Sequence, residues 1–369
     1  MGVVVTVPGK LILAGEHSAV YGGAALVATV GLTARVEAAR ARREAPSPAV
    51  RVELRDLGLE LSESWTALVD YAERARSAWD LYAVSPGPAS FRAVRGDDPA
   101  HLVKVALGEV AADRGGPSGL PAIDLAVSSE IPIGSGFGSS AALAVAIPAA
   151  ALAALGGEPT VELLARLGLE VERRQHGTPS GADHNTVLRG GVVRVDRDPG
   201  GGVTVHPLKP APELLERFGV YDTGVPAEST GEVVAAVRAL RDREPAAFEQ
   251  RLGRMAEAVE TIAATLVAGG DEAQLESSSE RLAGAIRAFE RCLEELGVVP
   301  ASLEGWIRRI EARGAAAKVS GAGSLSEGGA GGLLVYRAPG CDRLARELAG
   351  IVHYPVTLGV RGLAVEVVE

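Results

Sequence analysis

Residues 132–140 of this 369-residue chain read Pro-Ile-Gly-Ser-Gly-Phe-Gly-Ser-Ser, and an alanine-rich apolar run at 141–155 follows at once. Glycine at Gly134, Gly136 and Gly138 lets a backbone approach a bulky anion closely, and a helix N-terminus offers it unpaired N–H groups. Serine at the helix start supplies an N-cap or a hydroxyl for a metal ion. The pattern predicts a phosphate-binding loop before a buried helix, although a glycine-rich turn with an ordinary serine cap fits the same residues. It has neither the Walker lysine nor the glycine spacing of a dinucleotide site.

The composition indicates a globular protein and excludes several functions. Apolar residues make up 47% of the chain, and 37 basic against 47 acidic side chains give a net charge of −10. An acidic chain with no basic stripe is not typical of nucleic-acid binders. Two cysteines, Cys292 and Cys341, are too few for a disulfide framework and lack zinc-ligand spacing. The longest apolar run has 15 residues, short of the roughly 20 of a membrane span, and no signal peptide is visible, so we expect a cytoplasmic protein with no nucleic-acid or membrane partner.

The basic residues are almost all arginine. Only Lys10, Lys104, Lys209 and Lys318 are lysines, and Asn185 is the one asparagine. We interpret this bias as a sign of a GC-rich genome. A lysine or asparagine in such a chain is a candidate for a position that needs that side chain.

The first candidate site segment runs from Pro8-Gly-Lys10 through Gly15-Glu-His17 to Tyr21-Gly-Gly23. Lys10 lies in an apolar strand, where a charge needs a partner or a ligand. Glu16 and His17 lie where that strand meets its turn, a common place for functional groups. The alternative is a surface lysine beside a turn with incidental polar residues.

The second segment is Glu172-Arg-Arg-Gln-His-Gly-Thr-Pro-Ser-Gly-Ala-Asp183-His184-Asn185. Glu172 falls in the last turn of a helix predicted over 160–174, where a negative charge opposes the helix dipole. A bound cation would explain it. Asp183 follows a Pro-Ser-Gly turn, which holds side chains rigidly. A solvated polar loop is the competing interpretation.

The third segment, Lys318-Val-Ser-Gly-Ala-Gly323, lies between two predicted strands at 316–320 and 332–336. Such a strand, glycine loop and strand can close over a phosphate or a second substrate. A flexible hairpin loop is equally compatible with these residues.

The order of elements favours an α+β fold of two domains. A composition shift at 196–212, with three consecutive glycines, is taken as the junction, which gives domains at 1–196 and 197–369. The second domain is predicted to be mostly helical, with helices at 229–243, 245–268, 271–296 and 301–313. A polar loop is expected at 44–48.

Taken together, these segments resemble the three signatures of the GHMP kinases, a superfamily of small-molecule kinases, in family order. In detail the segments at 8–23 and 172–183, and Asp222-Thr-Gly-Val-Pro226 with Thr230, resemble the mevalonate kinase family. The resemblance implies an N-terminal domain like the second domain of ribosomal protein S5 and a ferredoxin-like C-terminal domain. It also implies ATP-dependent phosphorylation of the primary hydroxyl of mevalonate, with Mg²⁺.

The resemblance implies a role for each matching residue. Asp183 would be the catalytic base, and Lys10 beside it would stabilise the alkoxide and the transferring phosphoryl group. Ser140 and Glu172 would hold Mg²⁺, while Glu16 and His17 would help to line the substrate pocket. The ATP phosphates would be bound by two glycine loops, comprising Pro132, Gly134, Ser135, Gly136, Gly138, Ser139, Ser140, Gly321 and Gly323.

Two departures and several alternatives remain open at this point. Residues 324–330 interrupt the glycine string of the third signature and put Glu327 near an anionic ligand, and His184 stands where the family has Asn. The alternatives are a phosphomevalonate or sugar kinase, or a decarboxylase or non-catalytic sensor with the same fold. Retention of Lys10, Glu172 and Asp183 together argues against a sensor. A homodimer is common in such families.

Overall fold

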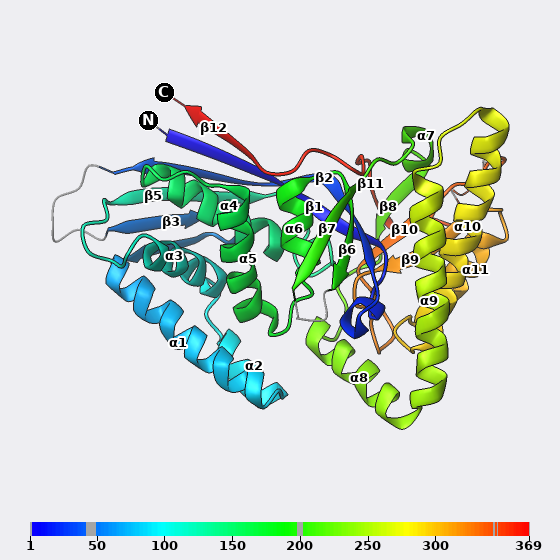
Figure 1. Cartoon of the computed structure of the whole chain (residues 1–369), viewed down its shortest axis with the longest axis horizontal. Coiled ribbons are helices and arrows are strands. Elements are labelled where there is room, and N and C mark those ends of the chain that lie inside the picture. The colour runs from blue at the N-terminus through cyan, green and yellow to red at the C-terminus, as the bar shows by residue number, and fades with distance from the viewer. Residues whose placement is uncertain (1, 42–48, 198–201, 342–343, 345, 369) are drawn as a thin grey trace.

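The computed structural model describes residues 2–41, 49–197, 202–341, 344 and 346–368. The loop expected at 44–48 lies outside these residues. The described chain forms two sheets side by side, each packed against helices (Figure 1). This arrangement confirms the predicted α+β class.

The first sheet has eight strands within the described residues. Six of them follow the order β12-β1-β2-β5-β3-β4, while β6 pairs with the first residues of β2, Ala25–Ala28, and β7 pairs with β6. Its strands are β1 (Gly2–Ala14), β2 (Ala25–Arg40), β3 (Val50–Leu54), β4 (Leu59–Glu63), β5 (Ile123–Ser129), β6 (Val192–Arg197), β7 (Val203–Leu208) and β12 (Ala364–Val368). Alternate residues of β1, such as Val3, Val5 and Val7, belong to the hydrophobic core. That alternation is what one covered sheet face requires.

Helices cover this sheet on one side (Figure 1). They are α1 (Trp65–Val84), α2 (Pro88–Arg95), α3 (His101–Asp113), α4 (Ser139–Ala154), α5 (Val161–His176) and α6 (Ala182–Arg189). Helix α4 packs against β1 and β2, and its alanines from Ala141 to Ala151 lie fully buried. The buried helix predicted from the alanine run is therefore confirmed, with Pro148 inside it.

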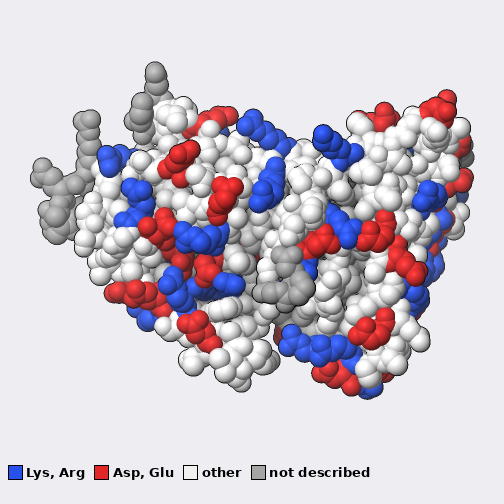
Figure 2. Space-filling model, viewed as in Figure 1, with Lys and Arg blue, Asp and Glu red and all other residues white. Residues whose placement is uncertain are grey.

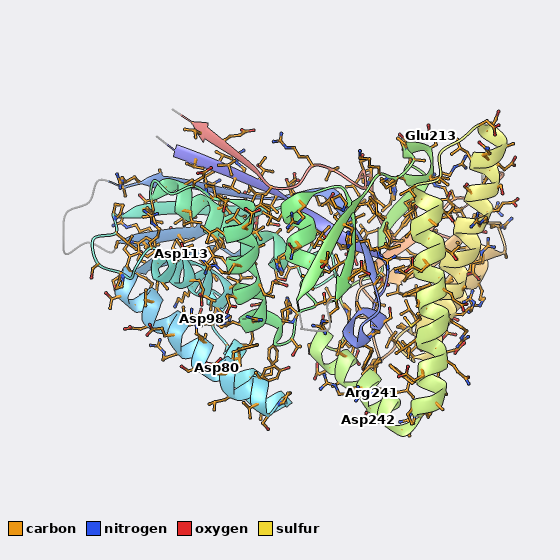
Figure 3. The ribbon with its side chains drawn as sticks, in the orientation of Figure 1. Asp80, Asp98, Asp113, Glu213, Arg241 and Asp242 are labelled. Atoms are coloured by element: carbon orange, nitrogen blue, oxygen red, sulfur yellow. The ribbon has the colours of Figure 1, made fainter. Side chains whose placement is uncertain are left out.

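The second sheet has the order β11-β8-β10-β9. Its strands are β8 (Phe218–Asp222), β9 (Ala316–Ser320), β10 (Gly332–Tyr336) and β11 (Val352–Tyr354), and the helices of this half are α7 (Pro212–Leu215), α8 (Thr230–Arg243), α9 (Pro245–Leu266), α10 (Glu272–Glu295) and α11 (Ala301–Glu311). The predicted bounds of β9 and β10 are confirmed, and those of the four long helices agree to within a few residues. At one end of this half, Arg241 and Asp242 lie where α8 ends (Figure 3).

The strand pairing does not follow the predicted division at 196/197. Strand β7 pairs antiparallel with β6 in the first sheet, because its alternating residues continue that sheet. The last strand, β12, pairs with β1, so the two ends of the chain lie together (Figure 1). The C-terminal part of the chain therefore leaves the first sheet after β7 and returns to it at the end.

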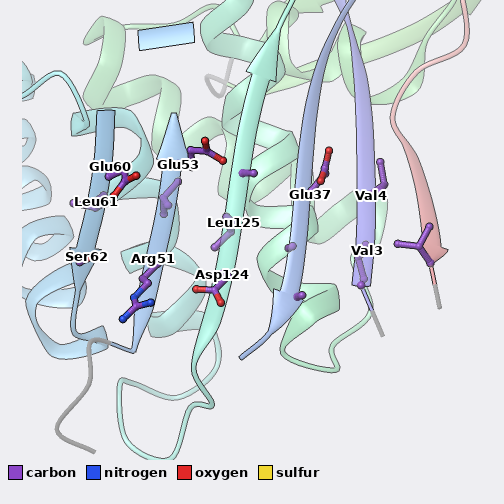
Figure 4. A pocket seen from close by; sticks show the side chains of 16 residues that line it. Val3, Val4, Glu37, Arg51, Glu53, Glu60, Leu61, Ser62, Asp124 and Leu125 are labelled. Carbon is purple, nitrogen blue, oxygen red and sulfur yellow. The ribbon is translucent and has the colours of Figure 1, made fainter. Parts of the chain in front are cut away.

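The open face of the first sheet is polar. A cavity of about 640 Å³ on it is lined by residues that include Arg51, Glu53 and Asp124 (Figure 4), and by no candidate site residue. Acidic and basic side chains are interspersed over the face shown in Figure 2. No helix in the described part of the chain is long and apolar enough to cross a membrane.

Candidate active site

The centre of the candidate site is an ion pair between Lys10 of β1 and Asp183 of α6. Lys10 Nζ lies 3.1 Å from Asp183 Oδ2, with side-chain exposures of 6% and 33%. Asp183 stands in the first turn of α6, which begins directly after Gly181 in a left-handed conformation. Asn185 Nδ2 donates a hydrogen bond of 2.9 Å to the Gly181 carbonyl. The asparagine therefore helps to fix the turn that presents Asp183.

The glycine loop at 132–140 lies against Lys10. The Lys10 backbone N–H donates to the Phe137 carbonyl over 2.8 Å. At Gly138 (φ +81°), a Cβ atom would stand only 2.6 Å from Lys10 Cγ. Glycine is needed here both for the left-handed backbone and for room beside the lysine stem.

Residues 134–137 of this loop alternate between the surface and the interior. Ser135 and Phe137 are buried, whereas Gly134 and Gly136 are exposed. The buried pair anchors the loop, and the exposed glycines leave backbone groups open to a ligand. Helix α4 then begins at Ser139 with no side-chain cap, so its first N–H groups are available to an anion.

Glu172 and Ser140 lie beside the ion pair. Glu172 is 1% exposed, and its Oε1 atom has no hydrogen-bond partner among the described residues. Burial raises the pKa of Glu172 to about 8, with a further contribution from the negative charge of Asp183; the Ser140 hydroxyl and Lys10 act in the opposite direction. The Glu172 carboxyl is buried with little positive charge nearby and lies beside the Ser140 hydroxyl. These two oxygen groups fit Mg²⁺, which prefers hard oxygen ligands and keeps several waters.

His176, which the sequence did not single out as a site residue, also contacts this group. Its Nε2 atom lies 2.8 Å from Ser140 Oγ and 3.9 Å from Glu172 Oε1. The His176 side chain is 38% exposed, so the ring lies at the solvent-facing edge of this group. Within the described residues, no three His, Cys, Asp or Glu side chains group as a metal site.

The third signature adjoins the second. The Gly332 N–H donates to the Ser135 carbonyl over 3.0 Å, and a Cβ at Gly136 would stand 3.1 Å from the Ser320 carbonyl oxygen. Gly321 and Gly323 have φ values of +116° and +77°, which favour glycine. The two glycine loops therefore form one continuous surface.

The insertion at 324–330 is bonded to the start of α11 and to Glu228. Glu327 accepts hydrogen bonds from the N–H groups of Ala301 and Ser302 at the start of α11, where a carboxylate is favourable. Glu228 accepts one from the Ser324 hydroxyl at 2.8 Å and another from the Leu325 N–H at 3.0 Å. The carboxylate of Glu327 is therefore bonded to the start of α11, and its placement near an anionic ligand stays a prediction.

Glu16 and His17 lie deeper than the sequence suggested. They are 4% and 6% exposed. Glu16 Oε1 accepts a hydrogen bond from the Lys318 ammonium, and His17 Nε2 lies 3.0 Å from the Ala322 carbonyl. The sequence analysis did not predict either contact. The one signal for the contact between Glu16 and Lys318 was that Lys318 is among the chain's four lysines.

Comparisons with known proteins agree with this geometry. Residues 101–191 match the model of the GHMP kinases N terminal domain. The mevalonate kinase of Thermococcus gammatolerans is 30% identical over 343 residues, which cover 92% of this chain and 90% of that protein. The chain belongs to the mevalonate kinase family. The Pyrococcus furiosus mevalonate kinase is 29% identical and covers 99% of both chains.

Solved structures show the same fold. A crystal structure of mevalonate kinase superposes with a TM-score of 0.72 at 18% identity, over 96% of this chain and 98% of that one. Streptococcus pneumoniae phosphomevalonate kinase in complex with phosphomevalonate and AMPPNP gives a TM-score of 0.67 at 19% identity, over 96% and 99%. These likenesses confirm the predicted two-domain GHMP kinase fold.

Proposed function

We propose that this protein transfers the γ-phosphoryl group of ATP to the primary hydroxyl of mevalonate, giving 5-phosphomevalonate and ADP. The observation that carries the proposal is the Lys10–Asp183 pair, set at the start of α4 beside the two glycine loops. The names of the relatives support the substrate: those described above at 30% and 29% identity are called mevalonate kinases.

Asp183 is the proposed base. Its side chain is one-third exposed, so the substrate hydroxyl can reach the carboxylate and pass it a proton. Lys10 is almost buried and forms an ion pair with Asp183, which holds the carboxylate in place. The same ammonium stands where negative charge grows on the alkoxide oxygen and the transferring phosphoryl group, and phosphoryl transfer depends chiefly on such positioning and charge.

The backbone of residues 134–139 and the N-terminus of α4 bind the phosphates in this proposal, with Gly321 and Gly323 facing them from the second half of the molecule. Ser140 and Glu172 would hold Mg²⁺, which neutralises phosphate charge when bound. Ser140 Oγ already contacts His176 Nε2, and this contact holds the hydroxyl in place next to Glu172.

The test measures ADP release with mevalonate, phosphomevalonate and galactose in turn. Turnover should be greatest with mevalonate. Turnover with another of these alcohols and none with mevalonate would keep the phosphotransferase assignment and reject this substrate, since a phosphomevalonate kinase shares the fold.

The role of Asp183 is tested by Asp183→Asn. We expect nucleotide binding to persist and phosphoryl transfer to fall by at least about 100-fold, the lower end of what positioned acid–base groups contribute. Asp113→Asn is the matched control, since Asp113 pairs with Arg166 at the end of α3, away from the site (Figure 3). Turnover in Asp183→Asn equal to that in the control would remove Asp183 as the base.

A further inference from the structure

A buried ion pair joins the two halves of the molecule near the site. Lys318 of β9 and Glu16, just after β1, each have side chains that are only 1% exposed. The Lys318 ammonium donates to Glu16 Oε1, to the Val319 carbonyl at 2.6 Å and to the Ile12 carbonyl at 3.2 Å. Two of these three acceptors belong to the segment that continues from Lys10.

Further contacts join the same two segments. Ser320 Oγ accepts a hydrogen bond of 2.9 Å from the Ile12 N–H and lies 3.1 Å from the Ile12 carbonyl. His17 Nε2 lies 3.0 Å from the Ala322 carbonyl. Lys318, Ser320 and Ala322 therefore hold residues 12–17, and the last of them lies in the glycine loop of the third signature.

The held segment is strained. His17 has φ +58° and is the one non-glycine residue with positive φ in the described part of the chain. Such a conformation persists only where the surroundings impose it. The contacts of Glu16 and His17 with Lys318 and Ala322 are the surroundings that impose it here.

Stability alone does not explain a lysine at this position. Replacing a buried ion pair by apolar side chains of similar volume is often neutral or stabilising. Glu290 of α10 adds a second buried carboxyl, whose Oε2 accepts from the Val319 N–H, and Lys318 is the cation that both carboxyls face. Burying the Lys318 ammonium costs free energy, and this ammonium is bonded to the carbonyl of Ile12, two residues from Lys10. Its placement fits a role in aligning β9 with β1.

We propose that Lys318 is a positioning residue that fixes the glycine loop of the third signature (Gly321–Gly323) in register with β1, so that this loop and Lys10 meet the same phosphate group. This inference rests on the proposed phosphoryl transfer. It assigns Lys318 no contact with the substrate. Its action passes through Glu16, the Ile12 carbonyl and the backbone of β9.

The test compares Lys318→Met with Lys104→Met, each assayed well below its own Tm and normalised to folded protein by circular dichroism. Lys104 is the matched control, because it forms partly exposed pairs with Asp98 and Glu63 away from the site. We expect kcat per folded molecule to fall by at least about tenfold in Lys318→Met, since a displacement of about 1 Å costs up to 100-fold. The control should stay within twofold of the unmodified protein.

A purely structural role would lower the Tm of Lys318→Met and leave its kcat per folded molecule unchanged, and that result overturns the proposal. If Lys318→Met does not fold, Ser320→Ala takes its place. It removes the side-chain bonds to Ile12 without leaving a buried charge, and an unchanged kcat there is equally decisive against the proposal. All assays use whichever alcohol the unmodified protein phosphorylates. An inactive unmodified protein therefore refutes the proposed function, whereas an active variant refutes only the role of Lys318.

Discussion

Replacing Gly138 with alanine tests whether the glycine loop positions the catalytic lysine. A Cβ at residue 138 would stand 2.6 Å from Lys10 Cγ and 3.0 Å from Lys10 Cε. Non-bonded carbon atoms settle at about 3.5–4.0 Å. The lysine stem or the loop must therefore move by about 1 Å.

The expected loss follows from that displacement. Lys10 Nζ now lies 3.1 Å from Asp183 Oδ2, and a shift of about 1 Å breaks this contact. Misplacement on this scale costs about 100-fold in rate. The alanine also takes on a left-handed backbone, which costs about 1–3 kcal/mol of stability and lowers Tm by several degrees.

Gly156→Ala separates the two effects. Gly156 closes the same helix α4 with φ +77°, close to the +81° of Gly138, and a Cβ there meets nothing within 4 Å. Steady-state ADP release and thermal unfolding are measured for both variants. Both should lose similar stability, and only Gly138→Ala should lose about 100-fold in kcat. Equal kcat values for the two variants would refute the argument that this loop holds Lys10.

Two further outcomes can be measured on groups away from Lys10. Burial lowers the pKa of His101 to about 4 from an unfolded value of 6.5; between these pH values the unfolded chain binds a proton that the folded chain does not, so the free energy of unfolding falls as pH falls. His101→Gln should flatten that decline by at most about 1.4 kcal/mol per pH unit in urea titrations at pH 7 to 4. An unchanged slope in His101→Gln contradicts the burial argument. Glu327→Gln weakens the cap on α11 and should lower Tm slightly without changing the KM for ATP; a lower KM would place Glu327 against the nucleotide after all.

The elements that the sequence predicted well are those whose local pattern agrees with their burial. Helix α4 is an alanine run between a glycine loop and Gly156, and strands β9 and β10 are short apolar runs beside glycines. In these cases the apolar residues, the length of the segment and the glycines at its ends all favour the same secondary structure. Tertiary packing agrees with the local preference of these three segments.

The elements that were missed depend on packing. Helix α6 reads as a polar loop at 182–185, yet it is buried against α4 and α5, and packing overrides the weak propensity. Strand β7 lies in what looked like a junction and pairs with β6. Its side chains are largely exposed, so no apolar run marks it.

The site was predicted only as far as the resemblance extended. Lys10 and Asp183 meet across the fold, and nothing in their local sequence pairs them. Glu16 and Lys318 are 302 positions apart, so their contact could not be found from spacing either. The roles assigned to Asp183, Lys10, Ser140 and Glu172 stay predictions until the variants are assayed.

The scarcity of lysine takes on meaning once burial is known. Lys10 has its stem against Gly138, and Lys318 directs its N–H groups to three acceptors in a fully buried space. A compact ammonium can do both, whereas the planar guanidinium of arginine is wider and holds its donors in a fixed fork. Lys104 is partly exposed in ordinary ion pairs, and nothing in the structure explains Lys209, which is exposed. In a chain that otherwise uses arginine, a buried lysine therefore marks a place where a single compact charge is required, and both such places lie on the strands that bring the two glycine loops together.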